Sequence, residues 1–393
     1  MLQNPPEDKP PTDPGTKLPD VGTTIFSVMS ALAAEHGAIN LSQGYPDFDC
    51  PARLQSLVQQ CMAEGLNQYA PMAGVPRLQE ALARKMLELY GREVDPATEV
   101  TVTAGATEAL FCAFSALVRS GDEVIVFDPV YDAYQPAIHL AGGRTVRIPL
   151  TSGDYAVDWT KVADALNEHT RAIVINNPHN PTGATLSRSD LETLAELLRD
   201  RNVYVIADEV YEHIVFDGQE HQSIHRHEEL AARSLVISSF GKTFHATGWK
   251  VGYCIAPRRL TEELRKVHQF VTFSVATPLQ HAYARFLEED TEHYRALPRF
   301  YQQKRDLFCS LLAGSRFRFR PSAGTYFQLA DYSEISDRPD TEFARWLTTE
   351  VGVAVIPVSV FQEAPDPVQR LVRFCFAKND DTLGAAAERL CRI

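Results

Sequence analysis

Several common sequence patterns are missing from this chain of 393 residues. No apolar run approaches the roughly 18 residues of a membrane-spanning helix, so no membrane protein is expected. The seven cysteines form no CxxC pair and several lie in apolar stretches such as "LFCAF". This favours free thiols in a reducing cytoplasm over disulfides or zinc. No GxGxxG follows a predicted strand, which disfavours a nicotinamide-dependent dehydrogenase.

Positive charge is also scarce, because 38 Lys and Arg face 51 Asp and Glu, for a formal net charge of −13. Phosphate backbones and anionic membranes would be repelled, so no nucleic-acid or membrane partner is predicted. The first twenty residues, "MLQNPPEDKPPTDPGTKLPD", lack the basic-then-apolar pattern of a signal peptide. They are predicted to be a flexible arm, too short and too acidic for the DNA-binding region of a regulator.

One histidine cluster allows a metal interpretation and a simpler alternative. His221, His225 and His227 lie within "EHQSIHRHEEL". Three histidines this close could bind a transition metal, but the segment has no HExxH and no matching cysteines. A polar loop before a strand is the simpler interpretation, and no metal is predicted.

From about residue 99 to 285, short apolar runs alternate with helical patterns. "EVTVTAG", "GDEVIVFDP", "RTVRIPL", "RAIVINN", "VYVIADEVYEHI", "SLVISSFGK" and "KVGYCIAP" are strand candidates. The alternation predicts an α/β fold with a mostly parallel sheet sandwiched by helices. After residue 285, longer helices and short strands predict a smaller α+β domain. We expect residues 1–47 to form the arm and the start of the small domain, residues 48–285 the large domain, and residues 286–393 the small C-terminal domain.

Three loops at predicted strand ends contain unusual polar residues. In "TAGATEAL", Gly105 leads into a helix whose free N–H groups suit a phosphate, although small residues also begin helices for packing reasons. In "NNPHNPTG", Asn180 projects from a rigid loop, unless it serves only an Asx-turn. In "ADEVYEH", Asp208 follows a buried strand and needs a cation or donors, and Tyr211 could face the same space.

The fourth loop, "SSFGKTFHATGWKVGY", contains Lys242 without an acid within seven residues on either side. Lys242 could be an ordinary surface lysine. A lysine that forms a Schiff base must lose its proton, and a surrounding poor in carboxylates favours this. Pyridoxal phosphate has a pyridine nitrogen, a phenolate oxygen, a phosphate and an aldehyde. The four loops contain a partner for each: an acid for the nitrogen, an amide and a phenol for the oxygen, a cradle for the phosphate and an amine for the aldehyde.

"NPHNPTG", "DEVYEH" and "SSFGKTFHATGWKVGY" occur in the order and at the spacing of the class I aminotransferases of pyridoxal-phosphate fold type I. The chain resembles this family from about residue 20 to its C-terminus. Within the family, "INLSQGYPDF", "NQYAPMAGVP", "TVTAGATEAL" and "VRFCFAK" resemble the methionine aminotransferases of bacteria, relatives of the kynurenine aminotransferases. The resemblance implies pyridoxal 5′-phosphate as cofactor and a homodimer with active sites at its interface.

The resemblance also implies a role for each matching residue. Lys242 would form the Schiff base and move the α-proton, with Asp208 opposite the pyridine nitrogen and Tyr211 and Asn180 at the ring hydroxyl. Arg373 would bind the substrate α-carboxylate. The other cofactor-binding residues implied are Gly105, Ala106, Thr107, Tyr131, Ser239, Lys250 and, from a second subunit, Tyr69. The other substrate-binding residues implied are Asn180, which would also contact the substrate, Gly44, Tyr45, Ile25 and Phe273.

The chain departs from the family pattern at two positions. Lys250 stands where many members have arginine, and Ile25 stands where the kynurenine enzymes have tryptophan. The expected reaction is ping-pong transamination between an apolar or aromatic L-amino acid, methionine first, and a 2-oxo acid. A cysteine-conjugate β-lyase remains the alternative, because elimination begins with loss of the same α-proton.

Overall fold

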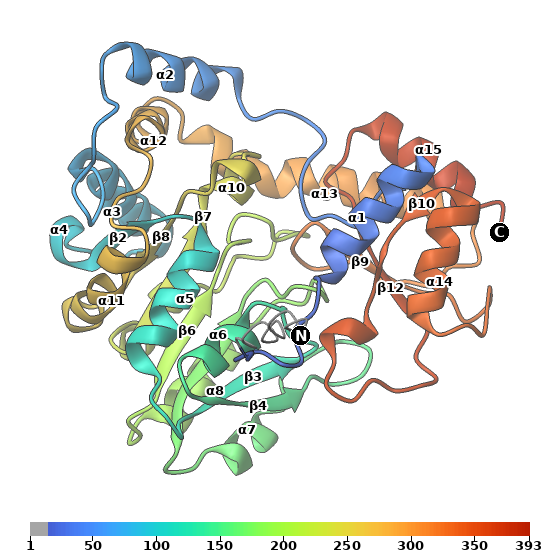
Figure 1. The fold of residues 1–393 in the computed structure, drawn as a ribbon, viewed down its shortest axis with the longest axis horizontal. Coiled ribbons are helices and arrows are strands. Elements are labelled where there is room, and N and C mark those ends of the chain that lie inside the picture. Colours follow the sequence, from blue (N-terminus) through green and yellow to red (C-terminus); the bar gives the residue numbers. More distant parts are fainter. Residues whose placement is uncertain (1–14) are drawn as a thin grey trace, which may run out of the picture.

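The computed structural model describes residues 15–393, and a seven-stranded sheet forms its centre (Figure 1). The strand order is β2-β8-β7-β6-β5-β3-β4. β8 alone runs in the direction opposite to the other six strands of this sheet, so the predicted mostly parallel α/β fold is confirmed. The strands are β2 (Val100–Thr103), β3 (Glu123–Asp128), β4 (Arg144–Pro149), β5 (Thr170–Asn176), β6 (Tyr204–Asp208), β7 (Ser234–Ser239) and β8 (Gly252–Ile255).

Alternate residues of the central strands belong to different cores. Val174 and Ile206 pack in a core with α5 (Ala106–Leu117), α6 (Tyr134–Leu140) and α11 (Arg258–Val271). Ile173 and Val205 pack in the opposite core, with α7 (Trp159–Ala165), α8 (Arg188–Leu198) and α9 (Glu228–Ala231). Both faces of the sheet are therefore covered, which explains why its inner strands are almost continuously apolar.

A second group of helices packs beside β2 and β8 at the edge of the sheet. Helix α12 (Thr277–Glu289) packs against both α2 (Ala52–Ala63) and α3 (Pro76–Tyr90), and α4 (Pro96–Glu99) leads into β2. Among the described residues, no helix is both long and apolar enough to cross a membrane.

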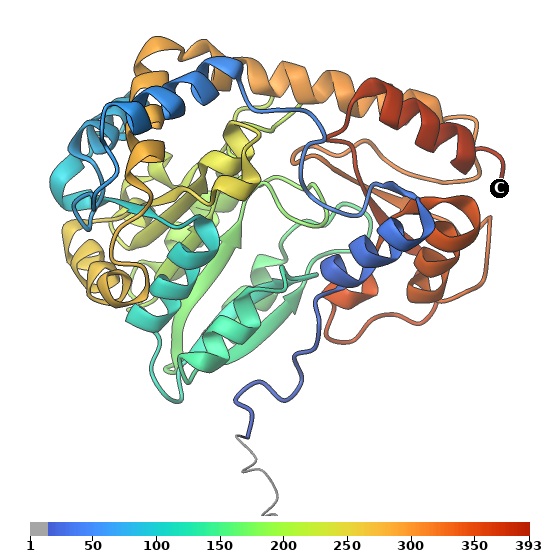
Figure 2. The same cartoon turned by 45° about the horizontal axis from the view of Figure 1, so that its top comes forward.

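The C-terminal part contains two small sheets, β11-β12-β9 and β1-β10. Figure 2 shows α1, from near the N-terminus, beside these C-terminal elements, while the long α13 spans the molecule. The elements are α1 (Ile25–His36), β1 (Ile39–Asn40), α13 (Glu292–Leu312), β9 (Phe327–Asp331), α14 (Asp340–Trp346), a π-helical turn (Leu347–Val351), β10 (Val353–Ala354), β11 (Ile356–Pro357), β12 (Leu371–Cys375) and α15 (Asp380–Leu390). The division of the chain at residues 47 and 285 stays a prediction, and most of the predicted arm lies outside the described residues.

Three predicted strands are shorter than the sequence suggested. β6 ends at Asp208, because its pairing with β5 and β7 stops there and the chain turns. β7 ends at Ser239, and Lys242 lies on the one-turn helix α10 (Phe240–Thr243). β8 begins at Gly252, so Lys250 of the predicted strand "KVGYCIAP" lies before it. The remaining short helices are Ile224–Arg226, Thr247–Trp249 and Ser359–Phe361.

Candidate active site

A pocket of about 210 Å³ opens where β5, β6 and β7 end. It collects segments that are distant in sequence, from the strand-end loops to β12, because parallel strands place their carboxyl ends at one edge. The predicted site residues that line it are Gly44, Ala106, Thr107, Tyr131, Asn180, Asp208, Tyr211, Ser239, Lys242, Lys250 and Arg373.

Asp208 is the last residue of β6 and is buried. Its Oδ2 accepts a hydrogen bond from the Tyr134 hydroxyl at 2.6 Å, and its Oδ1 accepts one from the Val210 N–H at 3.3 Å. Burial raises the pKa of Asp208 to about 6, although these two donors act in the opposite direction. The carboxylate therefore lacks a cation strong enough to offset its desolvation, and a protonated ring nitrogen would supply one.

Lys242 is not an ordinary surface lysine, because its amine lies inside the pocket. Its Nζ donates to the Tyr326 hydroxyl at 2.8 Å and to the Gly44 carbonyl at 3.1 Å. Burial, together with the positive charges of Lys250 and Arg373, lowers the pKa of Lys242 to about 8. The amine is thus adjusted toward the neutral form that a nucleophile or a base requires.

Arg373 extends from β12 into the same pocket and is 1% exposed. Its Nη1 donates to Asn180 Oδ1 at 2.7 Å and its Nη2 to the Ser42 carbonyl at 3.2 Å. Its Nε has no partner within residues 15–393. A buried guanidinium with a free donor suits a bidentate carboxylate.

The start of α5 forms a cradle that leaves no room for side chains. Gly105 is the N-cap residue with φ of 81°, and a Cβ there would lie 3.3 Å from Lys250 Nζ. A Cβ on Gly252 would lie 2.9 Å from the Ala106 nitrogen. The N–H groups of a helix start and an amine thus converge at one place, as an anion site requires.

Four further predicted site residues, one for the cofactor phosphate and three for the substrate, do not line the pocket within this single chain. Tyr69 and Phe273 are 84% and 48% exposed, and their rings contact each other edge to face at 5.4 Å. Tyr45 is 43% exposed. Ile25 lies beside a neighbouring surface pocket instead. Their roles stay predictions.

Sequence reasoning assigned no role to several lining residues, although all of them except Phe26 and Phe327 lie within the quoted motifs. They are Phe26, Gln43, Leu110, Asn176, Val210, Thr247 and Phe327. It also missed Tyr134 and Tyr326, which contact Asp208 and Lys242. The aromatic pattern of "GTYFQL", which enters β9 at Phe327, was the only available signal for Tyr326 and Phe327.

Two of the three clustered histidines, His221 and His225, are buried in different surroundings. His221 Nε2 pairs with Glu209 at 3.0 Å, whereas His225 is buried and its two ring nitrogens lack partners in the described part of the chain. Within residues 15–393, the one group of three close metal-ligand types is Glu108, Cys112 and His268.

Comparison with known proteins identifies the class to which this fold and site belong. Residues 36–390 match the model of the family "Aminotransferase class I and II", and the chain belongs to this family. The predicted recognition is confirmed, and with it the use of pyridoxal phosphate, the cofactor of this family.

Individual relatives show which members of the family this chain resembles. The chain is 53% identical to methionine aminotransferase of Escherichia coli over 98% of its length and 99% of the relative's. A crystal structure of an Escherichia coli methionine aminotransferase superposes with a TM-score of 0.95, covering 98% of this chain and 100% of the other. Kynurenine–oxoglutarate transaminase 1 of Rattus norvegicus is 36% identical, over 95% of this chain and 96% of the relative.

The pocket's own residues fit pyridoxal phosphate. A buried acid without a strong cation, an amine with a lowered pKa and a helix start opposite Lys250 match its ring nitrogen, aldehyde and phosphate. The fit depends on groups that the folded chain places together and on no single motif.

Proposed function

We propose that this chain transfers the amino group of an apolar L-amino acid, methionine above others, to a 2-oxo acid in two half-reactions. The observation that carries the proposal is the nearly full-length similarity to methionine aminotransferase. The arrangement of Lys242, Asp208 and Arg373 in one pocket supports the same reaction.

Each residue of the pocket then has a task. Pyridoxal phosphate, when bound, stabilises negative charge on the α-carbon of the amino acid. Arg373 binds the α-carboxylate and fixes the orientation of the α-C–H bond. Lys242 removes the proton from the α-carbon, for which its lowered pKa prepares it. Asp208 holds its negative charge opposite the ring nitrogen and keeps a proton there.

The remaining cofactor contacts follow from the same assignment. Tyr211 and Asn180 would hydrogen-bond the ring hydroxyl, and Tyr131 would stack on the ring. The phosphate would be bound by the α5 cradle, Ser239 and Lys250, with Tyr69 reaching in from a second subunit.

The number of basic side chains in the pocket supports a preference for amino donors with an apolar side chain. Within the described residues, its lining contains three basic side chains: Lys242, Lys250 and Arg373. The proposed mechanism uses all three, so the second carboxylate of aspartate would be buried without a partner, at a cost of several kcal/mol. A methionine side chain against Phe26 and Phe327 would gain about 1.5 to 3 kcal/mol from burial.

A panel of amino donors with one shared oxo-acid acceptor tests this preference through kcat/KM. Methionine, leucine and phenylalanine should exceed aspartate and glutamate by about a hundredfold or more, from the uncompensated charge. A preference for aspartate would mean that another basic residue reaches the pocket. Assays of pyruvate, ammonia and thiol from a cysteine conjugate separate the β-lyase from the transaminase.

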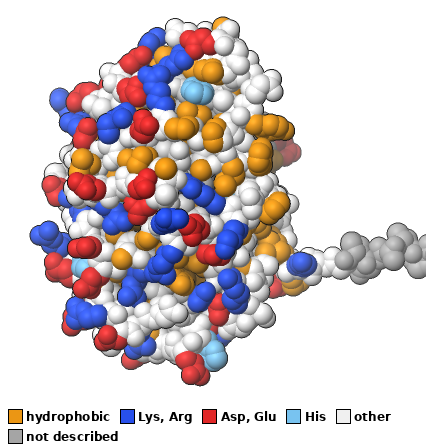
Figure 3. Space-filling model, turned by 90° about the vertical axis from the view of Figure 1, so that its left-hand side faces the viewer, with side chains coloured by type: hydrophobic (Ala, Val, Ile, Leu, Met, Phe, Trp, Pro, Cys, Tyr) orange, Lys and Arg blue, Asp and Glu red, His pale blue; other side chains and the backbone are white. Residues whose placement is uncertain are grey.

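We also propose that the working unit is a homodimer. Tyr69, Phe270, Val271 and Phe273 are large and exposed near the end of α11. Figure 3 shows the side of the molecule that carries α2, α3 and α11, where apolar side chains gather toward one margin among charges of both signs. Covering such side chains by a second copy would bring Tyr69 toward the partner's cradle. Light scattering should give twice the mass of 43.8 kDa, and a fully active monomer would contradict the proposal.

The seven cysteines are all free thiols, which supports a reducing cytoplasmic location. We therefore expect the enzyme to keep its full activity in strong reductant.

A further inference from the structure

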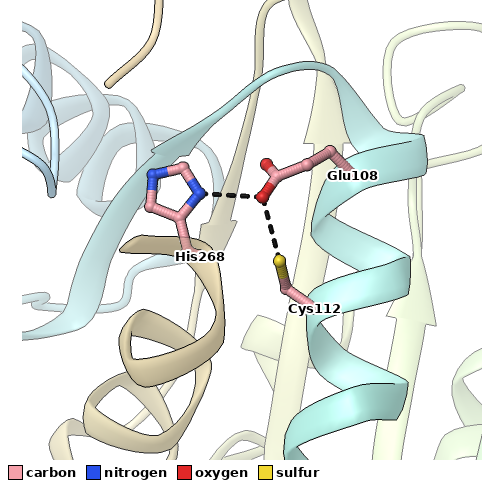
Figure 4. A group of neighbouring side chains, drawn as sticks. All are labelled: Glu108, Cys112 and His268. Carbon is pink, nitrogen blue, oxygen red and sulfur yellow. Dashed lines mark hydrogen bonds and ion pairs between the residues drawn. The ribbon is translucent and has the colours of Figure 1, made fainter. Parts of the chain in front are cut away.

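Directly behind the phosphate cradle lies a group of three side chains, Glu108, Cys112 and His268 (Figure 4). Glu108 is in the first turn of α5 and Cys112 is one turn further on, while His268 is in the last turn of α11. Glu108 Oε1 lies 2.8 Å from His268 Nδ1 and accepts from Cys112 Sγ at 2.9 Å. Glu108 Oε2 accepts from the Ala104 N–H at 3.0 Å. The proposed reaction uses none of these three side chains.

The contacts of His268 define its protonation. Its Nδ1 faces Glu108 and its Nε2 faces the Met72 carbonyl at 3.1 Å. A carbonyl only accepts, and so does an ionised carboxylate, whereas a neutral imidazole has a single N–H. When Glu108 is ionised, donation to both acceptors requires a hydrogen on each ring nitrogen, as in the imidazolium, and the place of His268 at the C-terminal end of α11 favours positive charge.

Glu108 is correspondingly held as a carboxylate. Burial acts to raise its pKa, but the hydrogen bonds from His268, Cys112 and the Ala104 N–H outweigh it and leave the pKa below its usual value. A negative charge therefore lies in the same helical turn as Ala106 and Thr107, whose N–H groups would receive the phosphate. Unpaired, this charge would repel a phosphate dianion across a partly buried region in which screening is weak.

We propose that His268 is a positioning residue for the cofactor phosphate, because its positive charge neutralises Glu108 beneath the cradle. The inference rests on the proposed function, since it requires a phosphate at the start of α5. His268 touches neither the phosphate nor the substrate in this assignment, and acts only through Glu108.

Four proteins test the charge: the native chain, His268→Gln, Glu108→Gln and the double variant. Glutamine at position 268 keeps an N–H donor for Met72 and removes the charge. His139→Gln, at an exposed position of α6, is the matched control. The dissociation constants of pyridoxal 5′-phosphate and of pyridoxal, which has no phosphate, are measured by absorbance and fluorescence titration of the protein freed of cofactor.

His268→Gln should weaken binding of pyridoxal 5′-phosphate by about tenfold to a hundredfold, from one uncompensated charge. Its binding of pyridoxal should change less than about twofold by the same reasoning. Glu108→Gln should bind pyridoxal 5′-phosphate at least as tightly as the native chain. The double variant should recover most of the affinity, because the charge that needed neutralising is gone.

A purely structural role for His268 predicts otherwise. A double variant as weak as His268→Gln, or equal losses for pyridoxal and its phosphate, would overturn the inference. If His268→Gln does not fold, weaker phosphate-dependent binding by Glu108→Gln than by the native chain overturns it equally. Failure of the native chain to bind pyridoxal 5′-phosphate at all would overturn the proposed function as well.

Discussion

Asp208→Asn should stabilise the protein freed of cofactor while disabling the enzyme. Asp208 is buried, and its pKa is raised from 3.8 to about 6 chiefly by desolvation. Asparagine has nearly the same shape, keeps an oxygen that can accept from Tyr134, and carries no charge to desolvate. The substitution therefore removes a cost of folding without opening a cavity.

The raised pKa of Asp208 sets the expected difference in unfolding free energy between the variant and the native chain, and the pH range in which that difference develops. The folded chain retains a proton on Asp208 between pH 3.8 and about 6, where the unfolded chain has lost it, so stability falls as pH rises through this window. The difference between the two pKa values, 6 minus 3.8 or about 2.2, corresponds to about 3 kcal/mol at about 1.36 kcal/mol per pKa unit. The stability advantage of the Asp208→Asn variant over the native chain should grow from about 2 kcal/mol at pH 5 to about 3 kcal/mol at pH 7.

Urea denaturation of the cofactor-free proteins at equal concentration, at pH 5, 6 and 7, measures this difference. Asp200→Asn, at an exposed position beyond α8, is the control and should show no such trend. In the loaded enzyme, Asp208→Asn should slow turnover by about two to four powers of ten, because the ring nitrogen loses its anionic partner. A destabilised Asp208→Asn protein at pH 7, or a difference independent of pH, would refute the reasoning.

Three further substitutions test the pocket. Lys242→Ala should lose nearly all turnover with every donor, and normal activity would exclude Lys242 as the catalytic amine. Arg373→Lys should raise KM for the amino acid and the oxo acid alike by about tenfold to a hundredfold, because a point charge replaces a planar fork; an unchanged KM would place the carboxylate elsewhere. Tyr134→Phe removes a donor from Asp208, so the pKa of that carboxyl should rise further, and the acidic limb of the kcat–pH profile should move to higher pH.

Local sequence predicted the parts of the site that lie at strand ends. Asp208 and Lys242 follow apolar runs that had to be buried strands, and parallel strands bring their carboxyl ends together. The antiparallel direction of β8 was not predictable from such runs, because a short apolar segment has no direction. Phe26 and Tyr326 were missed for a related reason: each reaches the pocket through packing of the C-terminal part against the large sheet, and neither lies in a polar motif.

Long-range ion pairs were equally hidden from the sequence. Glu108 is one residue of a predicted helix start, and His268 is one of many polar and charged residues on α11. They are 160 residues apart and meet only because α5 and α11 pack together on one face of the sheet. Only the fold shows that the acid in the cradle has a partner.

The acid-free loop correctly predicted that the amine of Lys242 loses its proton readily, but the absence of acids is only part of the physical reason. The sequence argument was that absent carboxylates let the amine lose its proton. In the folded chain an acid does act on the amine, since Asp208 raises the pKa of Lys242, but its effect is smaller than that of burial and those of Lys250 and Arg373. Desolvation and the positive charges of Lys250 and Arg373, which the proposed reaction needs for the phosphate and the carboxylate, therefore lower the pKa of the amine. A loop free of acids is needed so that no carboxylate closer than Asp208 reverses the balance.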